Sequence, residues 1–312
     1  MHSVTAPTRE AIVAAAARIS GFVRRTPILE LEQVVGGVPD GTVLKLDLLQ
    51  PTGTFKVRGA FNLLAAGERP ERVVAASGGN FALAIAHAAR ELGIIADLFV
   101  PDSSPPEKIG RISAYGAQVH VVAGVYHHAL DASRKFAATS GGLLAHAYDL
   151  PEVVAGAGTC GMEIAAQVPN ATTVLVAVGG GGLIGGISSW FRGDVSVIGV
   201  ETHGTPSMNA ALTAGRPVEV EVSGLAVSSL GSNRIGDIPW EAISQWVTGS
   251  VLVSDDEVRA AQRWLWNETR LVAEPGAATT VAALLTGRYQ PEPGETVVAL
   301  ICGANTDPGS VS

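Results

Sequence analysis

Short β-rich runs alternate with helical stretches along almost the whole chain, and this alternation constrains the fold more than any other feature. A strand is expected at residues 43–49, a helix at residues 80–92 and a last strand at residues 296–301. Such alternation favours an α/β protein with open, twisted and mostly parallel sheets. Because there are more strands than one compact sheet needs, we expect two such domains with a cleft between them.

Composition excludes several classes of protein. The 312 residues carry a net charge of −8 and contain no cluster of basic residues, so a nucleic-acid partner is not expected. No apolar run is long enough to span a membrane, and the N-terminus reads as an amphipathic helix, not a signal peptide, which predicts a cytoplasmic protein. The two cysteines, Cys160 and Cys302, lack the spacing of a metal site or a disulfide framework.

The segment at residues 51–56 joins an expected strand to an expected helix and ends in Lys56, one of only four lysines. Gly53 permits a tight turn, and Thr52 and Thr54 offer hydroxyl groups. Lys56 therefore falls in the first turn of the helix, where the positive end of the helix dipole should lower its pKa. A neutral lysine is a nucleophile for Schiff-base chemistry. The alternative is an ordinary solvated lysine on a helix.

Two further loops follow expected strands. Residues 77–80 precede a helix, and their backbone N–H groups could hold a carboxylate, although a plain tight turn with Asn80 as helix cap is the alternative. Cys302 follows the last strand, and a buried structural cysteine is its ordinary interpretation. Ligands bind at the carboxyl ends of strands in open α/β sheets, so these loops are candidate site segments.

Four consecutive glycines, residues 179–182, follow another expected strand. Such a loop lets several backbone N–H groups point at one phosphate at a helix N-terminus. It also satisfies the GxGxxG pattern, and Glu201 ends a strand nineteen residues beyond Gly182. That spacing matches a dinucleotide-binding fingerprint with its ribose-binding acid. A nicotinamide-dependent dehydrogenase is therefore a competing interpretation.

Taken together and in this order, the four loops resemble the serine/threonine dehydratase family. This is a family of fold-type II pyridoxal-phosphate enzymes related to serine racemase. The resemblance extends over residues 25–305 and rests above all on residues 49–60, which read LQPTGTFKVRGA. Residues 77–80, 178–183 and 274–277 support it. It implies a fold like that of the tryptophan synthase β subunit, with pyridoxal 5'-phosphate in the cleft between the two domains.

The resemblance also implies how the chain is divided and what it meets. Residues 1–71 and 148–312 are expected to form a large cofactor-binding domain, and residues 72–147 a small domain. The expected partner is a small-molecule amino-acid substrate, with neither nucleic acid nor membrane. A homodimer is the expected assembly.

The resemblance assigns a role to each loop. Lys56 forms the Schiff base and later moves the Cα proton. The other implied cofactor contacts are Phe55 and Gly224 beside the ring, Asn80 at the phenolic oxygen, Gly179, Gly180, Gly181 and Gly182 at the phosphate, and Cys302 at the pyridine nitrogen. The implied substrate contacts are Ser77, Gly78, Gly79, Asn80 and Phe81. Glu201 matches an acid of the relatives' cation site.

The implied reaction is the elimination of water from serine, threonine or a related β-hydroxy amino acid, with release of a 2-oxo acid and ammonia. The chain would then be a lyase of the L-threonine or L-serine ammonia-lyase type that serves amino-acid catabolism. Cys302 stands where the family usually has a serine. A neutral partner there does not stabilise a protonated pyridine nitrogen, so the ring is a weaker electron sink and prompt loss of a β-leaving group is favoured.

Several positions depart from the family pattern. Gly78 stands where racemases carry a serine, so racemisation should be poor. Phe81 and Leu83 replace a common histidine and glutamine near the substrate. Ser207 replaces a second acid of the cation site, which leaves a divalent or monovalent cation open. Besides the dehydrogenase, the alternatives are an amino-acid racemase, a β-replacement synthase and a non-catalytic binding module.

Overall fold

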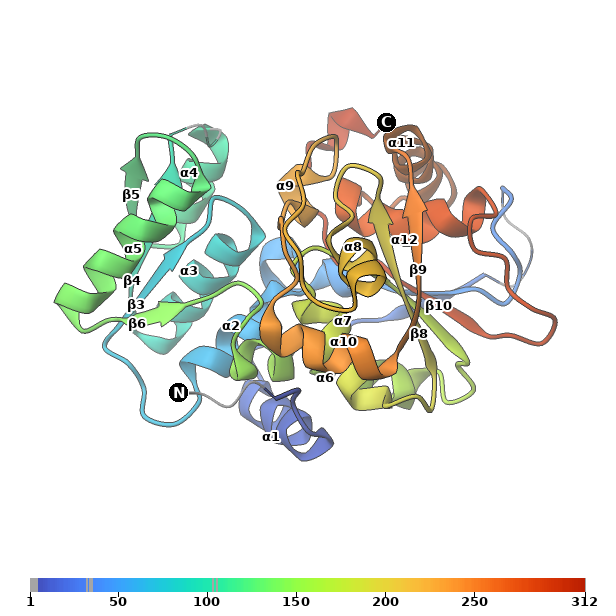
Figure 1. Cartoon of the computed structure of the whole chain (residues 1–312), viewed down its shortest axis with the longest axis horizontal. Coiled ribbons are helices and arrows are strands. Elements are labelled where there is room, and N and C mark those ends of the chain that lie inside the picture. The colour runs from blue at the N-terminus through green and yellow to red at the C-terminus, as the bar shows by residue number, and fades with distance from the viewer. Residues whose placement is uncertain (1–4, 32, 34–35, 103, 105, 312) are drawn as a thin grey trace.

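The computed structural model describes residues 5–31, 33, 36–102, 104 and 106–311, and its strands form two sheets (Figure 1). The larger sheet has the order β1-β2-β10-β7-β8-β9. Its strands are β1 (Ile28–Glu30), β2 (Val43–Lys45), β7 (Thr173–Ala177), β8 (Ser196–Thr202), β9 (Val247–Val253) and β10 (Val297–Leu300). The smaller sheet has the order β5-β4-β3-β6. Its strands are β3 (Arg72–Ala76), β4 (Ile95–Pro101), β5 (Gln118–Val122) and β6 (Leu143–Ala145).

Neighbouring strands of both sheets pair in parallel, except for the antiparallel pair β1–β2. The expectation of two mostly parallel sheets is confirmed. The chain enters the smaller sheet after α2 (Lys56–Leu64) and leaves it after β6, so all four strands of that sheet are consecutive in the sequence. The carboxyl end of β6 therefore leads directly back towards the larger sheet through residues 146–150.

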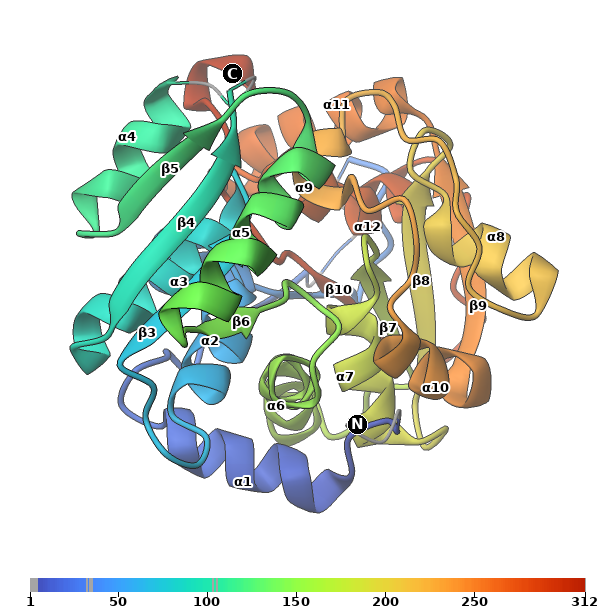
Figure 2. The same cartoon turned by 60° about the vertical axis from the view of Figure 1, so that its left-hand side comes forward.

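Helices cover both sheets. Around the larger sheet lie α1 (Arg9–Ile19), α2, α6 (Pro151–Gln167), α7 (Gly182–Phe191), α8 (Ser207–Ala214), α9 (Val227–Leu230), α10 (Asp237–Trp246), α11 (Asp255–Trp264) and α12 (Pro275–Leu285). With the smaller sheet go α3 (Asn80–Leu92), α4 (Pro106–Ala114) and α5 (Tyr126–Ser140). Figure 2 shows α5 in front of the smaller sheet and α3 behind it. Successive side chains of a strand point to opposite faces, so Val74 packs with the residues of α5 while Val73 packs with those of α3.

Two element boundaries differ from the expectation and have physical reasons. The strand expected at residues 43–49 ends at Lys45, and a 3-10 turn, η1 (Asp47–Leu49), follows. That turn directs the fully buried Asp47 to a cation, which an extended strand would not do. The helix after Ser254 has the expected capping box with Glu257, but it ends at Trp264 and is followed by a π-helical turn, η3 (Leu265–Thr269).

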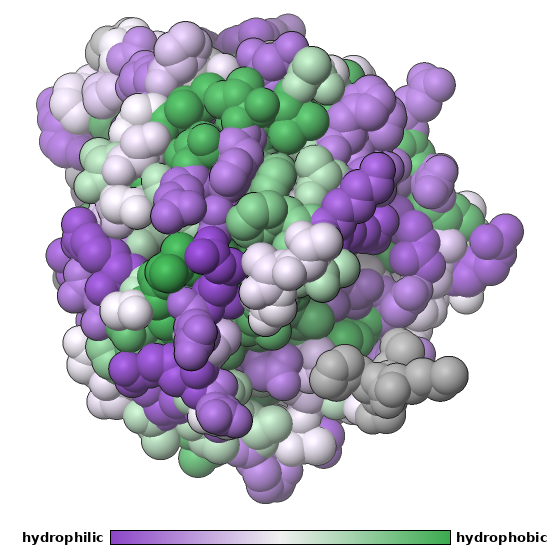
Figure 3. Space-filling model, turned by 90° about the vertical axis from the view of Figure 1, so that its left-hand side faces the viewer, coloured by the Kyte–Doolittle hydropathy of each residue, from purple (hydrophilic) through white to green (hydrophobic). Residues whose placement is uncertain are grey.

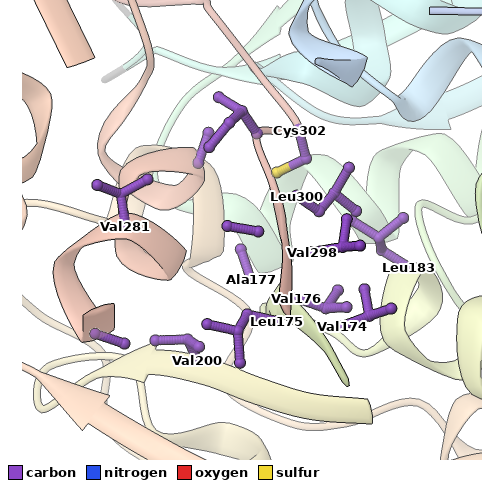
Figure 4. Close-up of a cluster of buried hydrophobic side chains, with 14 of the residues drawn as sticks. Val174, Leu175, Val176, Ala177, Leu183, Val200, Val281, Val298, Leu300 and Cys302 are labelled. Carbon is purple, nitrogen blue, oxygen red and sulfur yellow. The ribbon is translucent and has the colours of Figure 1, made fainter. Parts of the chain in front are cut away.

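The core of the larger sheet is built from the two central strands β7 and β10. Both are buried along their whole length, because helices cover each face. Figure 4 shows Val174, Leu175, Val176 and Ala177 packed with Leu183, Val200, Val281, Val298 and Leu300. Cys302 lies directly beyond this core, so the position of its side chain is set by a rigid strand.

The surface carries mixed side chains. Figure 3, which faces the side of the smaller sheet, shows hydrophilic residues interspersed with hydrophobic ones. In that half of the chain, the exposed large apolar residues are Ile95, Val121, Val125, Tyr126 and Leu144. Within the residues that the structure describes, no helix combines the length and apolarity needed to cross a membrane.

Candidate active site

All four loops selected from the sequence meet at one cavity of about 460 Å³ that opens to solvent. Ligand sites in proteins commonly enclose roughly 300–1,000 Å³. The lining residues are Phe55, Lys56, Asn80, Tyr148, Ala177, Gly179, Gly180, Gly181, Gly182, Leu183, Ser229, Leu230, Glu274 and Cys302. Segments more than two hundred residues apart are thus brought together at the carboxyl ends of strands, as the fold class predicts.

The loop before Lys56 is held in a fixed shape by the last strand's continuation. Thr52 and Gly53 both adopt left-handed backbone conformations, with φ of 65° and 72°. For a threonine this conformation is strained, and such strain persists only where surrounding contacts enforce it. Here the amide of Phe55 donates to the carbonyl of Cys302 (3.0 Å), and the amide of Ala304 donates to the carbonyl of Gly53 (2.8 Å).

Lys56 is the first residue of α2, and its amine faces the cavity. Its Nζ donates to the carbonyl oxygen of Ala147 (2.9 Å) and lies 5.0 Å from the ring centre of Phe55 and 5.9 Å from that of Phe81. The surrounding protein removes water from the amine, which lowers the pKa of Lys56 to about 8, against opposing effects of Cys302 and Glu274. The lowered pKa was expected, but the helix terminus was the wrong cause; burial is the dominant one.

The four-glycine loop forms the start of α7. Gly181, with φ of 90°, precedes the helix, whose first N–H groups have no acceptor within it. A Cβ at Gly180 would lie 2.3 Å from the ring of Tyr148, and one at Gly182 would lie 2.9 Å from its Cβ. Glycine is therefore required for Tyr148 to pack on this loop. The hydroxyl of Tyr148 is bonded to Ser232 (2.9 Å), and no sequence pattern pointed to this tyrosine.

Asn80 lies between two polar groups that the sequence interpretation left without a role. Its Nδ2 donates to both carboxylate oxygens of Glu274 (2.7 and 2.9 Å), and its Oδ1 accepts from Nδ2 of Asn305 (2.7 Å). Burial raises the pKa of Glu274 to about 7. A Cβ at residue 303 would lie 2.1 Å from Glu274 Oε1, so Gly303 makes room for the carboxylate.

A second cavity, of about 300 Å³, adjoins the first and shares Asn80 and Glu274 with it. Its other lining residues are Gly78, Gly79, Leu83, Lys108, Arg111, Ser228 and Asn305. Arg111 donates to Oδ1 of Asn305 (2.7 Å) and so connects α4 to the end of β10. Ser77 lines neither cavity, and its hydroxyl accepts from the amide of Gly79 (3.3 Å). Lys108 and Arg111 lie on a helix face with no sequence signal of function.

The structure does not bring Gly224 into either cavity. Gly224 has φ of 85°, and a Cβ there would lie 2.7 Å from Asp255 Oδ2. Glycine is thus explained at this position by its turn beside α11. Its expected place beside the cofactor ring stays a prediction.

Glu201 lies apart from the cavity residues and is fully buried. Its carboxylate accepts from the amides of Met208 (2.7 Å) and Asn209 (2.8 Å), which begin α8, and burial raises its pKa to about 7. A carboxylate used in this way is not free to bind a ribose, which argues against the dinucleotide alternative. Among the described residues, no group of three His, Cys, Asp or Glu side chains is placed to hold a metal ion. The expected cation ligand stays a prediction.

The groups at the cavity fit the chemistry of pyridoxal phosphate. Lys56 supplies an amine that is uncharged over much of the range above pH 8. The free N–H groups at the start of α7 suit a phosphate. Cys302 is almost fully buried, and burial raises the pKa of its thiol above the ordinary value, so it stays neutral.

Comparison with known proteins agrees with this geometry. Residues 19–303 match the model of a family described as pyridoxal-phosphate dependent enzyme. The L-threonine ammonia-lyase of Thermotoga maritima is 36% identical over 307 residues, which cover 96% of this chain and 76% of that protein. The phenylserine dehydratase of Ralstonia pickettii is 35% identical over 316 residues, which cover 98% of this chain and 96% of that protein.

Solved structures give the same result. A bacterial threonine deaminase, from the organism abbreviated T.th., superimposes with a TM-score of 0.90 at 32% identity, covering 96% of this chain and 99% of the other. Maize serine racemase gives a TM-score of 0.92 at 25% identity, covering 98% of this chain and 95% of the other.

Proposed function

The chain belongs to the family of pyridoxal-phosphate dependent enzymes, and from this we propose that it is an ammonia-lyase acting on small β-hydroxy amino acids. Serine and threonine are the favoured substrates, and the products are a 2-oxo acid and ammonia. The observation that carries the proposal is the Lys56 amine, whose pKa is lowered to about 8, in a cavity that also presents a four-glycine loop. The relatives named as threonine ammonia-lyases support it.

Each group of the cavity has a proposed task. Pyridoxal phosphate, when bound, supplies an electron sink for the bonds at the substrate's Cα. Lys56 binds the cofactor covalently through Nζ and afterwards holds the proton that leaves Cα, a role that its lowered pKa favours. Gly179, Gly180, Gly181 and Gly182 donate N–H groups to the phosphate. Cys302 faces the pyridine nitrogen as a neutral thiol.

The remaining groups orient the substrate and exclude water. Asn80 is held on both sides by Glu274 and Asn305, so its amide group is fixed before a ligand arrives. The second Nδ2 hydrogen can then reach the phenolic oxygen of the cofactor. We assign the substrate carboxylate to the backbone N–H groups of residues 77–79. Phe55 and Phe81 place apolar rings beside the amine.

The proposal is tested by assaying 2-oxo acid release from serine and threonine with added pyridoxal phosphate. We expect Lys56→Ala to remove turnover, whereas Lys135→Ala, at an exposed lysine of α5, should leave it unchanged. Borohydride reduction followed by peptide mapping should place the cofactor on Lys56. An adduct on another lysine, or full turnover by Lys56→Ala, would overturn the proposal.

Phe81 favours a second candidate substrate within the same reaction class. Its ring lies 5.9 Å from the Lys56 amine, and an aromatic β-substituent could pack against it. The relative from Ralstonia pickettii, named phenylserine dehydratase, supports this candidate. In a substrate panel, Phe81→His should lower the ratio of phenylserine to threonine turnover. An unchanged ratio would remove phenylserine as the favoured substrate.

Four further points remain proposals. We propose the small domain at residues 72–147 and the large domain at residues 1–71 and 148–312, which the separate sheet of β3–β6 supports; limited proteolysis tests these boundaries. The homodimer and the cytoplasmic location rest on the resemblance, and light scattering and cell fractionation test them. Activity with and without a chelator tests whether a cation binds at Glu201.

A further inference from the structure

Four charged side chains form a buried cluster behind the start of α2. We call Lys45, Asp47, Arg58 and Glu163 the ionic cluster. Lys45, Asp47 and Arg58 have no solvent exposure, and the side chain of Glu163 is 17% exposed. None of the four lines either cavity. Two cations and two anions balance, so the cluster adds no net charge to the interior.

Arg58 is the centre of the cluster, and all five of its N–H donors have partners. Nε and Nη2 bind the two carboxylate oxygens of Asp47 (2.8 and 2.6 Å). Nη1 and Nη2 bind those of Glu163 (2.8 and 2.9 Å), and Nη1 also donates to Thr159 (3.1 Å). Two forked ion pairs on one planar group fix its position in two directions, which a lysine ammonium cannot do.

Lys45 completes the cluster from the side of β2. Its Nζ uses all three donors, on Glu163 (2.7 Å), on Gln167 (2.8 Å) and on the carbonyl of Thr26 (2.8 Å). Lys45 therefore holds β2 to α6. Because its three donors are used in this way, Lys45 has none left for the carboxylate of Asp47, unlike Arg58.

The two residues that Arg58 and Asp47 join are the ends of the segment that carries Lys56. Asp47 begins η1 before the segment, and Arg58 is the third residue of α2 after it. Two positions along a helix correspond to about 200°, so Arg58 points away from the cavity when Lys56 points into it. The ion pair closes residues 47–58 into a ring of chain and links the ring to α6 through Glu163.

We propose that Arg58 is a positioning residue for Lys56: its two forked ion pairs fix the start of α2, and thereby the amine, relative to the cavity. The proposal rests on the proposed function, because it concerns the amine that binds the cofactor. Catalytic groups tolerate little displacement, and a shift of about 1 Å can reduce a rate by about 10²-fold. A cluster that merely stabilised the fold would not need to grip both ends of this one segment.

The experiment compares Arg58→Lys with Lys45→Met in the holoenzyme. Each removes hydrogen bonds from Glu163 within the same buried cluster, but only Arg58 grips the Lys56 segment. We expect Arg58→Lys to lower kcat by about 10–10²-fold with KM within about threefold. It should also shift the pH at which the near-visible absorption of the bound cofactor changes. Lys45→Met should lower the Tm at least as much, with kcat within about threefold of wild type and the spectral titration unmoved.

Opposite results overturn the proposal. If Arg58→Lys keeps the wild-type kcat and spectral titration, or if both variants lose activity in proportion to their Tm, the cluster is only structural. Should Arg58→Lys fail to fold, Asp47→Asn replaces it with Glu163→Gln as its control, and the same split in kcat is expected. If the wild-type chain itself neither binds pyridoxal phosphate nor releases a 2-oxo acid, the proposed function fails instead, which is a distinct outcome.

Discussion

Two lysines near α2 show how one side chain type serves opposite purposes. Lys45 has no solvent exposure and uses all three of its donors on a carboxylate, an amide and a carbonyl. The Lys56 amine has one recorded hydrogen bond, to a backbone carbonyl, and faces a cavity. A buried charge is stable when it is paired and satisfied, and it tends to neutralise when it is not. The ionic cluster is thus built to keep charge, and the cavity to remove it.

The largest expected effect comes from replacing each lysine by methionine. Lys56→Met should lower 2-oxo acid release by at least roughly 10³-fold, because the acid–base and covalent roles are both lost. Lys45→Met should retain turnover but lower the free energy of unfolding by about 3–5 kcal/mol, since it leaves buried partners uncompensated. Steady-state kinetics and denaturant unfolding of both variants measure the contrast. Loss of activity from Lys45→Met without loss of stability would break it.

Close-packed glycines in each region provide a second contrast. A Cβ at Gly156 would lie 2.5 Å from the carbonyl of Arg58, so Gly156→Ala should separate α2 from α6 and cost about 1–3 kcal/mol of stability. A Cβ at Gly180 would displace Tyr148 from the phosphate-binding loop that we propose. Gly180→Ala should therefore weaken pyridoxal-phosphate binding by roughly tenfold or more. Thermal unfolding and cofactor titration of both proteins should show opposite patterns.

The sequence predicted these two regions unequally. The Lys56 loop, the glycine loop and Asn80 were found because glycines and polar groups after strands mark ligand sites, and the boundaries of α3 were predicted to the residue. Glu274 was quoted in a motif without a role. Tyr148 and Arg111 reach the cavities only through the crossover from β6 and the placement of α4, which are tertiary facts. The ionic cluster was missed because its four members belong to four different elements.

A pH dependence of the apoenzyme's stability should sharpen the contrast further. Lys56 titrates at about 8 in the folded chain and at about 10.4 when unfolded. Between these values the unfolded chain binds more protons, so stability rises with pH. The destabilisation due to Lys56 is full below about pH 8 and gone above about 10.4. It amounts to no more than roughly 3 kcal/mol, at about 1.4 kcal/mol per pKa unit.

Urea unfolding of the apo proteins between about pH 7 and 10.5 measures this effect. Wild type should gain stability relative to Lys56→Met over that range, with Lys135→Met as the exposed-lysine reference. Equal pH profiles for wild type and Lys56→Met would show that the cavity does not disfavour the charged amine.

The smallest expected effect concerns the one carboxylate that borders the Lys56 cavity. Glu274, when ionised, raises the pKa of Lys56. Glu274→Gln should therefore shift the pH midpoint for capture of pyridoxal phosphate by the apoenzyme downwards, by less than about one unit. The rate of absorbance increase against pH measures the midpoint, with exposed Glu219→Gln as the control. An upward shift would contradict the proposed coupling.

The smaller sheet occupies one uninterrupted stretch of chain, from Arg72 to Ala145, and this has a consequence for how such an enzyme diversifies. The residues that we propose to face the substrate, including Gly78 and Phe81, lie in that stretch. The amine, its anchors in the ionic cluster and the glycine loop lie outside it. Recombination at two crossover points can therefore exchange specificity as a single cassette between relatives while the reactive apparatus is inherited unchanged.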